Sequence, residues 1–358
     1  MMTGISIEEE FLLVDPRTGA SCPRAEAVLA RHRICCPLPE GAAVHREPRP
    51  TQIEAVTGVC ETADELYGHL TAGRRTLAEA AAGEDCAVIA SGTPLRPSPD
   101  RDHDAEDRFG KVEADEACGC HVHVGVPDRE TAVAVVNHLA EWLPTLLALS
   151  GNSPFDGGLD TGYESWRTVR QSRFPGAGIA PYFADAAGFE EQVGKLVDCG
   201  ILVDEHRTFW LARPSSRWPG VEVRAADTAS TVDEAVLQGL LTRGLVRTAL
   251  TDLDRGVEAT PLDPQMASAA VWSAARHGLS GPAVDPVAGK PVPVGDRVAA
   301  LLAHTGQALE DTGDLALVRT LLGILEREGT GAGRQRRAAA DGEIAVLRML
   351  TEETVPHA

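Results

Sequence analysis

Residues 6–15 read SIEEEFLLVD, in which three consecutive glutamates interrupt a run of Ile, Phe, Leu and Val. Successive side chains of a β-strand point to opposite faces, so Glu8 and Glu10 share one face of the strand that we predict over residues 5–14. The sequence DPRTG at residues 15–19 is typical of the turn that would end this strand. The segment predicts a strand with carboxylates on one face.

Three other stretches place charged or imidazole side chains on apolar strands in the same way. They are TQIEAVTGVC at 51–60, CGCHVHVGV at 118–126 and GVEVRAAD at 220–227. His121 shares a face with His123, and Glu222 shares a face with Arg224. If the four strands lie side by side, one sheet face carries carboxylates, imidazoles and a guanidinium, which is costly unless ions bind there. The sequence therefore predicts a divalent-metal and phosphate site, and hence an enzyme.

Carboxylate oxygens on these strands suit Mg²⁺ or Mn²⁺. The candidate ligands are Glu8, Glu10, Glu54 and Glu222, with Glu47 as a further candidate seven residues before Glu54. A solvated outer face of an antiparallel sheet is the simpler alternative. One such strand would favour that alternative, but four strands with the same pattern favour the metal site.

The two histidines leave a second reading open, because His121 and His123 at this spacing can ligate one Zn²⁺. Cys118 and Cys120 precede them, but on a regular strand both cysteines face away from both histidines, so a mixed zinc site would need a bulge. We expect one histidine to join the carboxylates and the other to contact phosphate or substrate. A zinc-dependent hydrolase and a polar core network remain the alternatives.

Arginines supply the anion-binding candidates. Arg224 suits the charge that develops on a phosphoryl group, although a cross-strand salt bridge would give the same pattern. The further candidates are Arg167, Arg207, Arg213, Arg334 and Arg336. The last two follow a glycine-rich stretch at 329–333 that comes after a predicted helix rather than a strand, so it does not match a dinucleotide-binding fingerprint. A charged turn between helices is its alternative.

Composition excludes several classes of function. A net charge of −20 argues against nucleic-acid binding and disfavours anionic membranes. The first residues lack a basic region followed by an apolar run, so we expect no signal peptide. The most apolar stretch, 131–150, contains Asn137, His138, Glu141 and Pro144 and is too polar for a membrane span. Eight cysteines without regular spacing fit a reducing cytoplasm.

Hydrophobic spacing predicts an α+β part over residues 1–230 and a mainly helical part over 231–358, within a single catalytic domain. The expected helices are 61–82, 188–199, 232–254, 264–277, 296–310, 314–328 and 334–350, and further strands are expected at 208–213 and 220–225. Residues 31–50 are expected to be loop or an irregular edge, and residues 150–183 are expected to be a long loop with a functional role. The C-terminal helices could pack internally or between subunits, so a homo-oligomer is possible.

These segments together resemble the carboxylate-amine ligase family related to bacterial glutamate–cysteine ligases of type 2. The resemblance begins with EEEFLLVDPRTG, QIEAVTGVC, SGTPL and CGCHVHVGVPDRE. It continues in order with LSGNSPFDGGLDTGYESWRT, DEHRTFW, RPSS, VEVRAAD and GTGAGRQR. It spans essentially the whole chain, and the ordered set is far more specific than any one motif.

The resemblance implies a glutamine synthetase-like α+β fold, a curved antiparallel sheet whose concave face holds Mg²⁺ and ATP and whose other face is backed by helices. It implies ATP-dependent amide formation through an acyl phosphate, with glutamate–cysteine ligase activity as the default. A non-catalytic nucleotide-binding relative is an alternative. The metal ligands would be Glu8, Glu10, Glu54, His123 and Glu222, with Glu47 possible. Arg224 and Arg167 are the catalytic candidates, and the nucleotide-binding candidates are His121, Arg207, Arg213, Arg334 and Arg336.

A few positions depart from the pattern of this family. SGNSPF stands where SANSPF is usual, DEHR stands where DDHR is common, and Arg170 and Gln171 stand where Val and Trp are more typical. The metal ligands are intact, so we expect the ATP chemistry to be retained. Because the changes fall in the loop expected to shape the amino-acid pockets, we expect them to affect the choice of substrates.

Overall fold

A computed structural model describes residues 4–35, 37–97, 116–174, 176–202, 204, 208–216 and 218–355. Its centre is a seven-stranded sheet in the order β10-β11-β5-β1-β3-β2, in which β4 also pairs with β1. The strands are β1 (Ile5–Val14), β2 (Ala43–Arg46), β3 (Gln52–Val56), β4 (Ala87–Ile89), β5 (Gly119–Gly125), β10 (Ala212–Pro214) and β11 (Gly220–Asp227). Every pairing in this sheet is antiparallel, as predicted.

The register of the sheet brings the polar residues to one face. Directly opposed pairs are Glu8 with His121, Glu10 with Glu54, His123 with Glu222, and Glu222 with Arg213. Directly opposed residues of an antiparallel pair project on the same side of the sheet. The carboxylates, imidazoles and guanidiniums of five strands therefore share one face.

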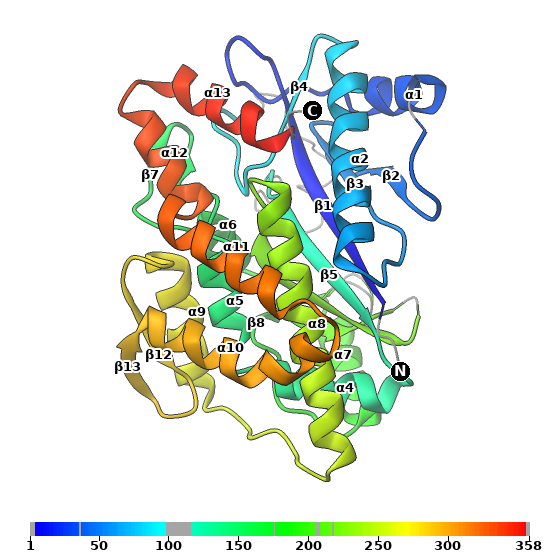
Figure 1. Ribbon diagram of the computed structural model, residues 1–358, viewed down its shortest axis with the longest axis vertical. Coiled ribbons are helices and arrows are strands. Elements are labelled where there is room, and N and C mark those ends of the chain that lie inside the picture. The colour runs from blue at the N-terminus through cyan, green and yellow to red at the C-terminus, as the bar shows by residue number, and fades with distance from the viewer. Residues whose placement is uncertain are drawn as a thin grey trace.

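The opposite face is apolar and is covered by helices. Ile5, Ile7, Cys120 and Val122 belong to a core that also contains side chains of the covering helices. These helices are α2 (Ala63–Ala82), α4 (Arg129–Leu139), α5 (Leu143–Leu149) and α8 (Val232–Asp254). Figure 1 shows α2 and α8 on either side of β1; α8 packs against β1 and β5, and α2 packs against β1. Cys120 faces this core, away from His121, as strand alternation predicts.

Side-chain caps begin the helices that hold the sheet. Thr62 and Glu65 form a capping box at the start of α2, and Thr231 and Glu234 form one at the start of α8. Asp128 caps α4 by accepting a hydrogen bond from the N–H of Thr131. Local sequence thus sets where the helices start beneath the sheet.

The remaining elements surround this two-layer unit. The helices are α1 (Ala25–Cys35), α6 (Trp166–Gln171), α7 (Ala186–Asp198), α9 (Pro264–His277), α10 (Val294–Asp311), α11 (Leu315–Glu328), α12 (Gly331–Ala339) and α13 (Glu343–Thr354). The short strands are β6 (Phe155–Asp156), β7 (Leu159–Asp160), β8 (Ala177–Gly178), β9 (Phe209–Trp210), β12 (Pro282–Asp285) and β13 (Lys290–Pro293). The predicted helices 232–254 and 264–277 are confirmed residue for residue.

Three of the expectations about local structure differ from the structure. Residues 150–183, expected to be loop, contain the helix α6, which Ser165 caps by accepting from the N–H of Thr168. Residues 31–50 contain the end of α1 and the edge strand β2, because Val28 and Leu29 of α1 pack into a small core and β2 pairs with β3. The helix expected over 334–350 is two helices, α12 and α13, because Gly342 adopts a φ of +99° between them. Glycine favours this conformation, which interrupts a helix.

The C-terminal helices pack internally against the sheet-bearing part. Val346, Leu347 and Leu350 of α13 share a core with Leu12 and Ile89 of the sheet. Figure 1 shows the chain returning to β4 at its C-terminal end. Among the described residues no single helix is long and apolar enough to cross a membrane, and only the pair Arg129–Leu139 and Leu143–Leu149, bent by 65°, meets the length and composition test together.

A half-buried histidine predicts how stability depends on pH. His304 stacks on Trp142 with ring centroids 4.9 Å apart, and burial lowers the pKa of His304 below its ordinary value of 6.5. Because the unfolded chain then binds protons more readily than the folded one, stability present above pH 6.5 is lost as the pH falls below it. The loss is at most about 1.4 kcal/mol per pH unit for one proton.

The variant His304→Phe keeps a ring against Trp142 and removes the titrating group. We expect its free energy of unfolding, measured with urea at pH 7 and pH 5.5, to fall less on acidification than that of the wild type. An equal loss in both proteins would exclude His304 as a source of this pH dependence.

Candidate active site on the polar face of the sheet

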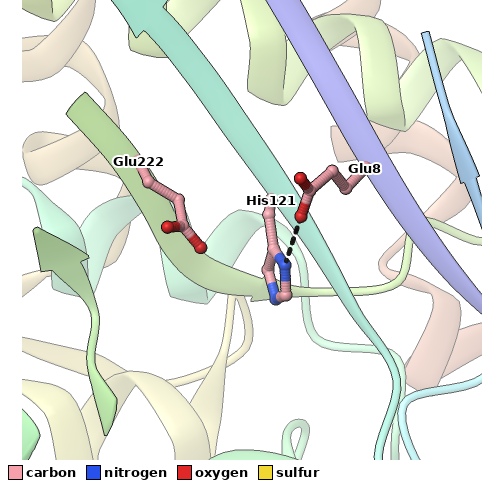
Figure 2. Close-up of side chains that lie close together, drawn as sticks. All are labelled: Glu8, His121 and Glu222. Atoms are coloured by element: carbon pink, nitrogen blue, oxygen red, sulfur yellow. Dashed lines mark hydrogen bonds and ion pairs between the residues drawn. The ribbon is translucent and has the colours of Figure 1, made fainter. Parts of the chain in front are cut away.

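Glu8, His121 and Glu222 lie together at the centre of the polar face. They come from β1, β5 and β11, and each offers a ligand atom within 4.8 Å of the other two (Figure 2). His121 Nδ1 lies 3.4 Å from Glu8 Oε2. His121 and Glu222 are 2% and 5% exposed. Two carboxylates and one imidazole at this spacing form a set of donors that suits a divalent cation.

A second acidic group lies beside the first, with members on β1, on β3 and directly after the end of β2. Glu10, Glu47 and Glu54 also offer oxygens within 4.8 Å of one another. Burial, then the charge of Glu8 and a hydrogen bond with Glu47, raise the pKa of Glu54 to about 10. A cation would relieve the repulsion among these carboxylates, so this group also fits a metal with oxygen ligands.

Two arginines hold Glu222, Arg213 from the edge strand β10 and Arg224 from β11, the strand of Glu222 itself. Arg213 Nε and Nη2 donate to its two carboxylate oxygens at 2.8 and 3.2 Å, and Arg224 Nη1 donates to Oε1. Burial alone would raise the pKa of Glu222, but the charges of Arg224 and Arg213 hold this pKa well below its usual value. Arg224 also lies 3.3 Å from His121 Nδ1. The site therefore combines ionised carboxylates with guanidiniums that suit a phosphate.

Unpartnered nitrogens test whether this site fits a metal ion. His121 Nε2 and His123 Nδ1 are buried and have no hydrogen-bond partner within the described part of the chain. His123 Nε2 lies 3.1 Å from Glu8 Oε1. Buried polar atoms normally have partners, so these nitrogens and the paired carboxylates fit a bound cation.

Arg167 approaches the same region from α6. Its side chain is 1% exposed, and its Nε and Nη1 have no hydrogen-bond partner among the described residues. A Cβ at Gly119 would overlap this guanidinium and would lie 2.8 Å from His121 Nε2. Glycine at position 119 therefore permits Arg167 and His121 to lie close together over the end of β5.

Asp227, which sequence reasoning missed, supports Arg167. It is fully buried, accepts hydrogen bonds from Ser153 Oγ at 2.6 Å and Ser165 Oγ at 2.7 Å, and lies 3.9 Å from Arg167 Nη1. Strict alternation would place Asp227 on the face opposite Glu222, but the pairing of β11 with β5 shifts register after Val223. The only signal in the sequence is an aspartate at the end of an apolar strand.

The structure does not gather every predicted residue at this face. Arg334 and Arg336 lie on α12, where Arg334 pairs with Glu234 and Glu353. Arg336 pairs with Asp160 and Glu164.

The glycine-rich stretch at residues 329–333 leads into α12 and has a structural role there. The N–H of Ala332 donates to the carbonyl oxygen of Gly151 at 2.9 Å. Arg207 lies outside the described residues.

The structure places the two histidines differently against the carboxylates. We expected His123 to be the metal ligand and His121 to contact the nucleotide. The structure groups His121 with Glu8 and Glu222, because His121 is the residue directly opposite Glu8. His123 lies opposite Glu222 and beside Glu8, one residue pair further along the strands.

Comparisons with known proteins agree with this geometry. A family model described as glutamate-cysteine ligase family 2 matches residues 4–352. A protein of Saccharopolyspora erythraea whose name assigns it provisionally as glutamate–cysteine ligase 2-2 is 49% identical over 98% of this chain and 92% of its own length. A Salinispora arenicola protein assigned provisionally as glutamate–cysteine ligase 2 is 42% identical over 98% of this chain and 95% of its own length.

A solved structure shares the fold. The crystal structure of glutamate–cysteine ligase from Francisella tularensis in complex with AMP superposes with a TM-score of 0.71. It covers 100% of this chain and 90% of the other, at 13% sequence identity. The likeness confirms the predicted α+β fold, an antiparallel sheet with one polar face and helices on the other.

Proposed function

The chain belongs to glutamate–cysteine ligase family 2, and we propose that it is an ATP-dependent ligase that joins an amino-acid carboxylate to an amine. The default substrates are glutamate and cysteine, which the names of the relatives suggest. The observation that carries the proposal is the polar face, where two groups of metal-type ligands lie beside guanidiniums. The AMP in the Francisella tularensis structure supports a nucleotide substrate.

The proposed reaction has two steps. A carboxylate oxygen of the first substrate attacks the γ-phosphorus of ATP, which gives an acyl phosphate and releases ADP. The amine then attacks the acyl carbon, phosphate leaves, and the nitrogen loses a proton. Neither step needs a covalent bond to the protein, so positioning and charge neutralisation are what the residues must supply.

Each part of the polar face has a role in this scheme. Glu8, His121 and Glu222 would hold one divalent ion, and Glu10, Glu47 and Glu54 would hold another. Bound Mg²⁺, or Mn²⁺ in its place, neutralises phosphate charge and orients the oxygens that react.

The arginines would contact the phosphates directly. Arg224, with Arg213 beside it, would face the phosphoryl group in transfer and stabilise its charge. Arg167, held by Asp227, would contact the nucleotide or the acyl phosphate from the end of the sheet.

The family membership favours this function over the two alternatives. A zinc-dependent hydrolase would use His121 and His123 together, whereas the ligand group at the centre of the face combines His121 with two carboxylates. A non-catalytic relative would have no need of buried, like-charged carboxylates, which cost free energy without a cation.

We further propose a cytoplasmic enzyme that works as a single catalytic domain on small molecules, without nucleic-acid or membrane partners. The net charge of −20 supports the last point, because it repels polyanions.

The test of the function is phosphate release from ATP and Mg²⁺ over pairs of amino acids and amines, with mass spectrometry of the products. We expect release that depends on both partners of a pair and a product whose mass equals their sum less one water. Phosphate release that needs neither substrate of the pair would contradict the proposed ligase activity. Hydrolysis of an amide in the absence of ATP would contradict it as well.

Magnesium should also stabilise the fold, because it relieves repulsion among the acidic residues. At about one hundred times its Kd, Mg²⁺ should raise the free energy of unfolding by about 2.7 kcal/mol. Thermal unfolding with MgCl₂, against NaCl at equal ionic strength, measures the gain. Glu54→Gln should reduce it and the exposed-site control Glu326→Gln should not; an equal gain in all three proteins would place the ion elsewhere.

A further inference from the structure

A cavity of about 530 Å³ lies between α6, residues 177–182 and α9, away from the ligand groups of the polar face. Three aromatic side chains line it, Tyr163, Tyr182 and Trp272. Trp272 is 53% exposed and Tyr182 is 41% exposed, so both rings are accessible from solvent. Cavities of this volume hold small organic molecules in many proteins.

The wall of the cavity is uncharged. Among the described residues that line it, no side chain is acidic or basic. Two of its polar groups already have partners in the protein: Asn137 exchanges hydrogen bonds with the backbone of Phe183 at 2.7 and 3.2 Å, and Trp272 Nε1 donates to Tyr163 Oη at 3.2 Å. An ion would lose its hydration here without compensation, whereas an apolar ring would bury its surface favourably.

The cavity and the polar face share α6 as a wall. Thr168 and Val169 line the cavity, and the preceding residue, Arg167, points to the sheet and lies 3.9 Å from Asp227. On the other side, Ala275 O of α9 accepts hydrogen bonds at 2.9 and 3.0 Å from the N–H groups of Glu164 and Ser165, the two residues directly before α6. A ligand between α6 and α9 would therefore contact the helix that positions Arg167 (Figure 1).

We propose that this cavity binds an uncharged, ring-bearing group, and that α6 links its occupancy to Arg167. Two sources share this chemistry: the side chain of the amine substrate, or a separate effector molecule. The first source rests on the proposed function, whereas binding itself does not.

Calorimetric titration with indole, an uncharged ring, tests the binding. We expect saturable binding to the wild type, and binding at least about tenfold weaker for indole-3-acetate, because no cation lines the cavity. Ala267→Trp fills the cavity and should weaken indole binding at least about tenfold. Ala269→Trp adds the same bulk to α9 at a position outside the cavity lining and should leave the affinity within about twofold.

Trp272→Ala keeps the test decisive if Ala267→Trp does not fold, because it alters an exposed side chain. Indole should bind this variant about threefold more weakly, or worse, since a ring contact is lost. Absence of saturable binding to the wild type, or unchanged affinity in both cavity variants, would overturn the proposal.

Turnover separates the two sources. Indole that raises the KM for the amine without changing kcat would assign the cavity to the substrate, and indole that changes kcat at saturating amine would assign it to an effector. A protein that binds indole with no effect on turnover would refute the link through α6. Binding of indole without any ATP-dependent ligation would contradict the proposed function and leave the cavity as a binding site.

Discussion

Replacing Glu222 with glutamine is expected to lower ligation-dependent phosphate release by at least about a hundredfold. Glu222 is 5% exposed and shares its ligand group with Glu8 and His121. Its carboxylate also compensates Arg213 and Arg224, both of which donate to it. The amide of glutamine keeps the shape and one acceptor but loses the charge, so the site loses a metal ligand and the negative charge that Arg213 and Arg224 share.

Steady-state phosphate release measures this loss, and circular dichroism checks that the variant is folded. Glu326→Gln makes the same chemical change at an exposed position of α11 and should keep wild-type turnover. Full turnover by Glu222→Gln would remove this residue from the mechanism and would count strongly against the metal site.

Replacing Arg74 with methionine is expected to lower the free energy of unfolding by about 3–5 kcal/mol. Arg74 is fully buried on α2, and its Nε and Nη2 donate to the two oxygens of Glu9 at 3.0 and 2.6 Å. It also donates to the carbonyl oxygens of Ala229, Ser230 and Thr354 at 2.7–3.2 Å. One side chain thus joins α2 to β1, to the start of α8 and to the C-terminal helix, and its loss leaves a buried carboxylate unpaired.

Urea unfolding at pH 7 measures the cost, and a second change tests its cause. If the unpaired Glu9 carries much of the penalty, adding Glu9→Gln to Arg74→Met should recover at least about 1 kcal/mol. Arg319→Met, at an exposed position, should change stability by less than about 0.5 kcal/mol. Equal stabilities for the Arg74 and Arg319 variants would show that the buried pair does not secure the fold.

The polar face was predictable because the residues between its members are buried. Ile5, Ile7 and Val122 must face the helices, and a shift of one residue would expose them, so alternation alone places Glu8, Glu10 and His121 on the other side. The strands are long enough and apolar enough for this pattern to be read directly.

What could not be predicted depends on register and on contacts that are distant in sequence. The choice between His121 and His123 depends on which of them lies directly opposite Glu8. The place of Asp227 depends on a register shift in β11 that no residue type announces.

Contacts in the helical part of the protein were unpredictable for the same reason, because they join residues that are distant in sequence. Arg334 pairs with Glu234 and Glu353 because α12 packs near the start of α8, far from it in the chain. The cavity beside α6 likewise has walls from segments about one hundred residues apart, which hydrophobic spacing alone cannot bring together.

The central claim is that the polar face binds divalent ions for ATP chemistry, and anomalous scattering tests it most directly. Crystals grown with Mn²⁺ and a non-hydrolysable ATP analogue should show manganese among Glu8, His121 and Glu222, among Glu10, Glu47 and Glu54, or at both groups, with phosphate oxygens near Arg224. Manganese bound only elsewhere, or a nucleotide bound away from this face, would contradict the account.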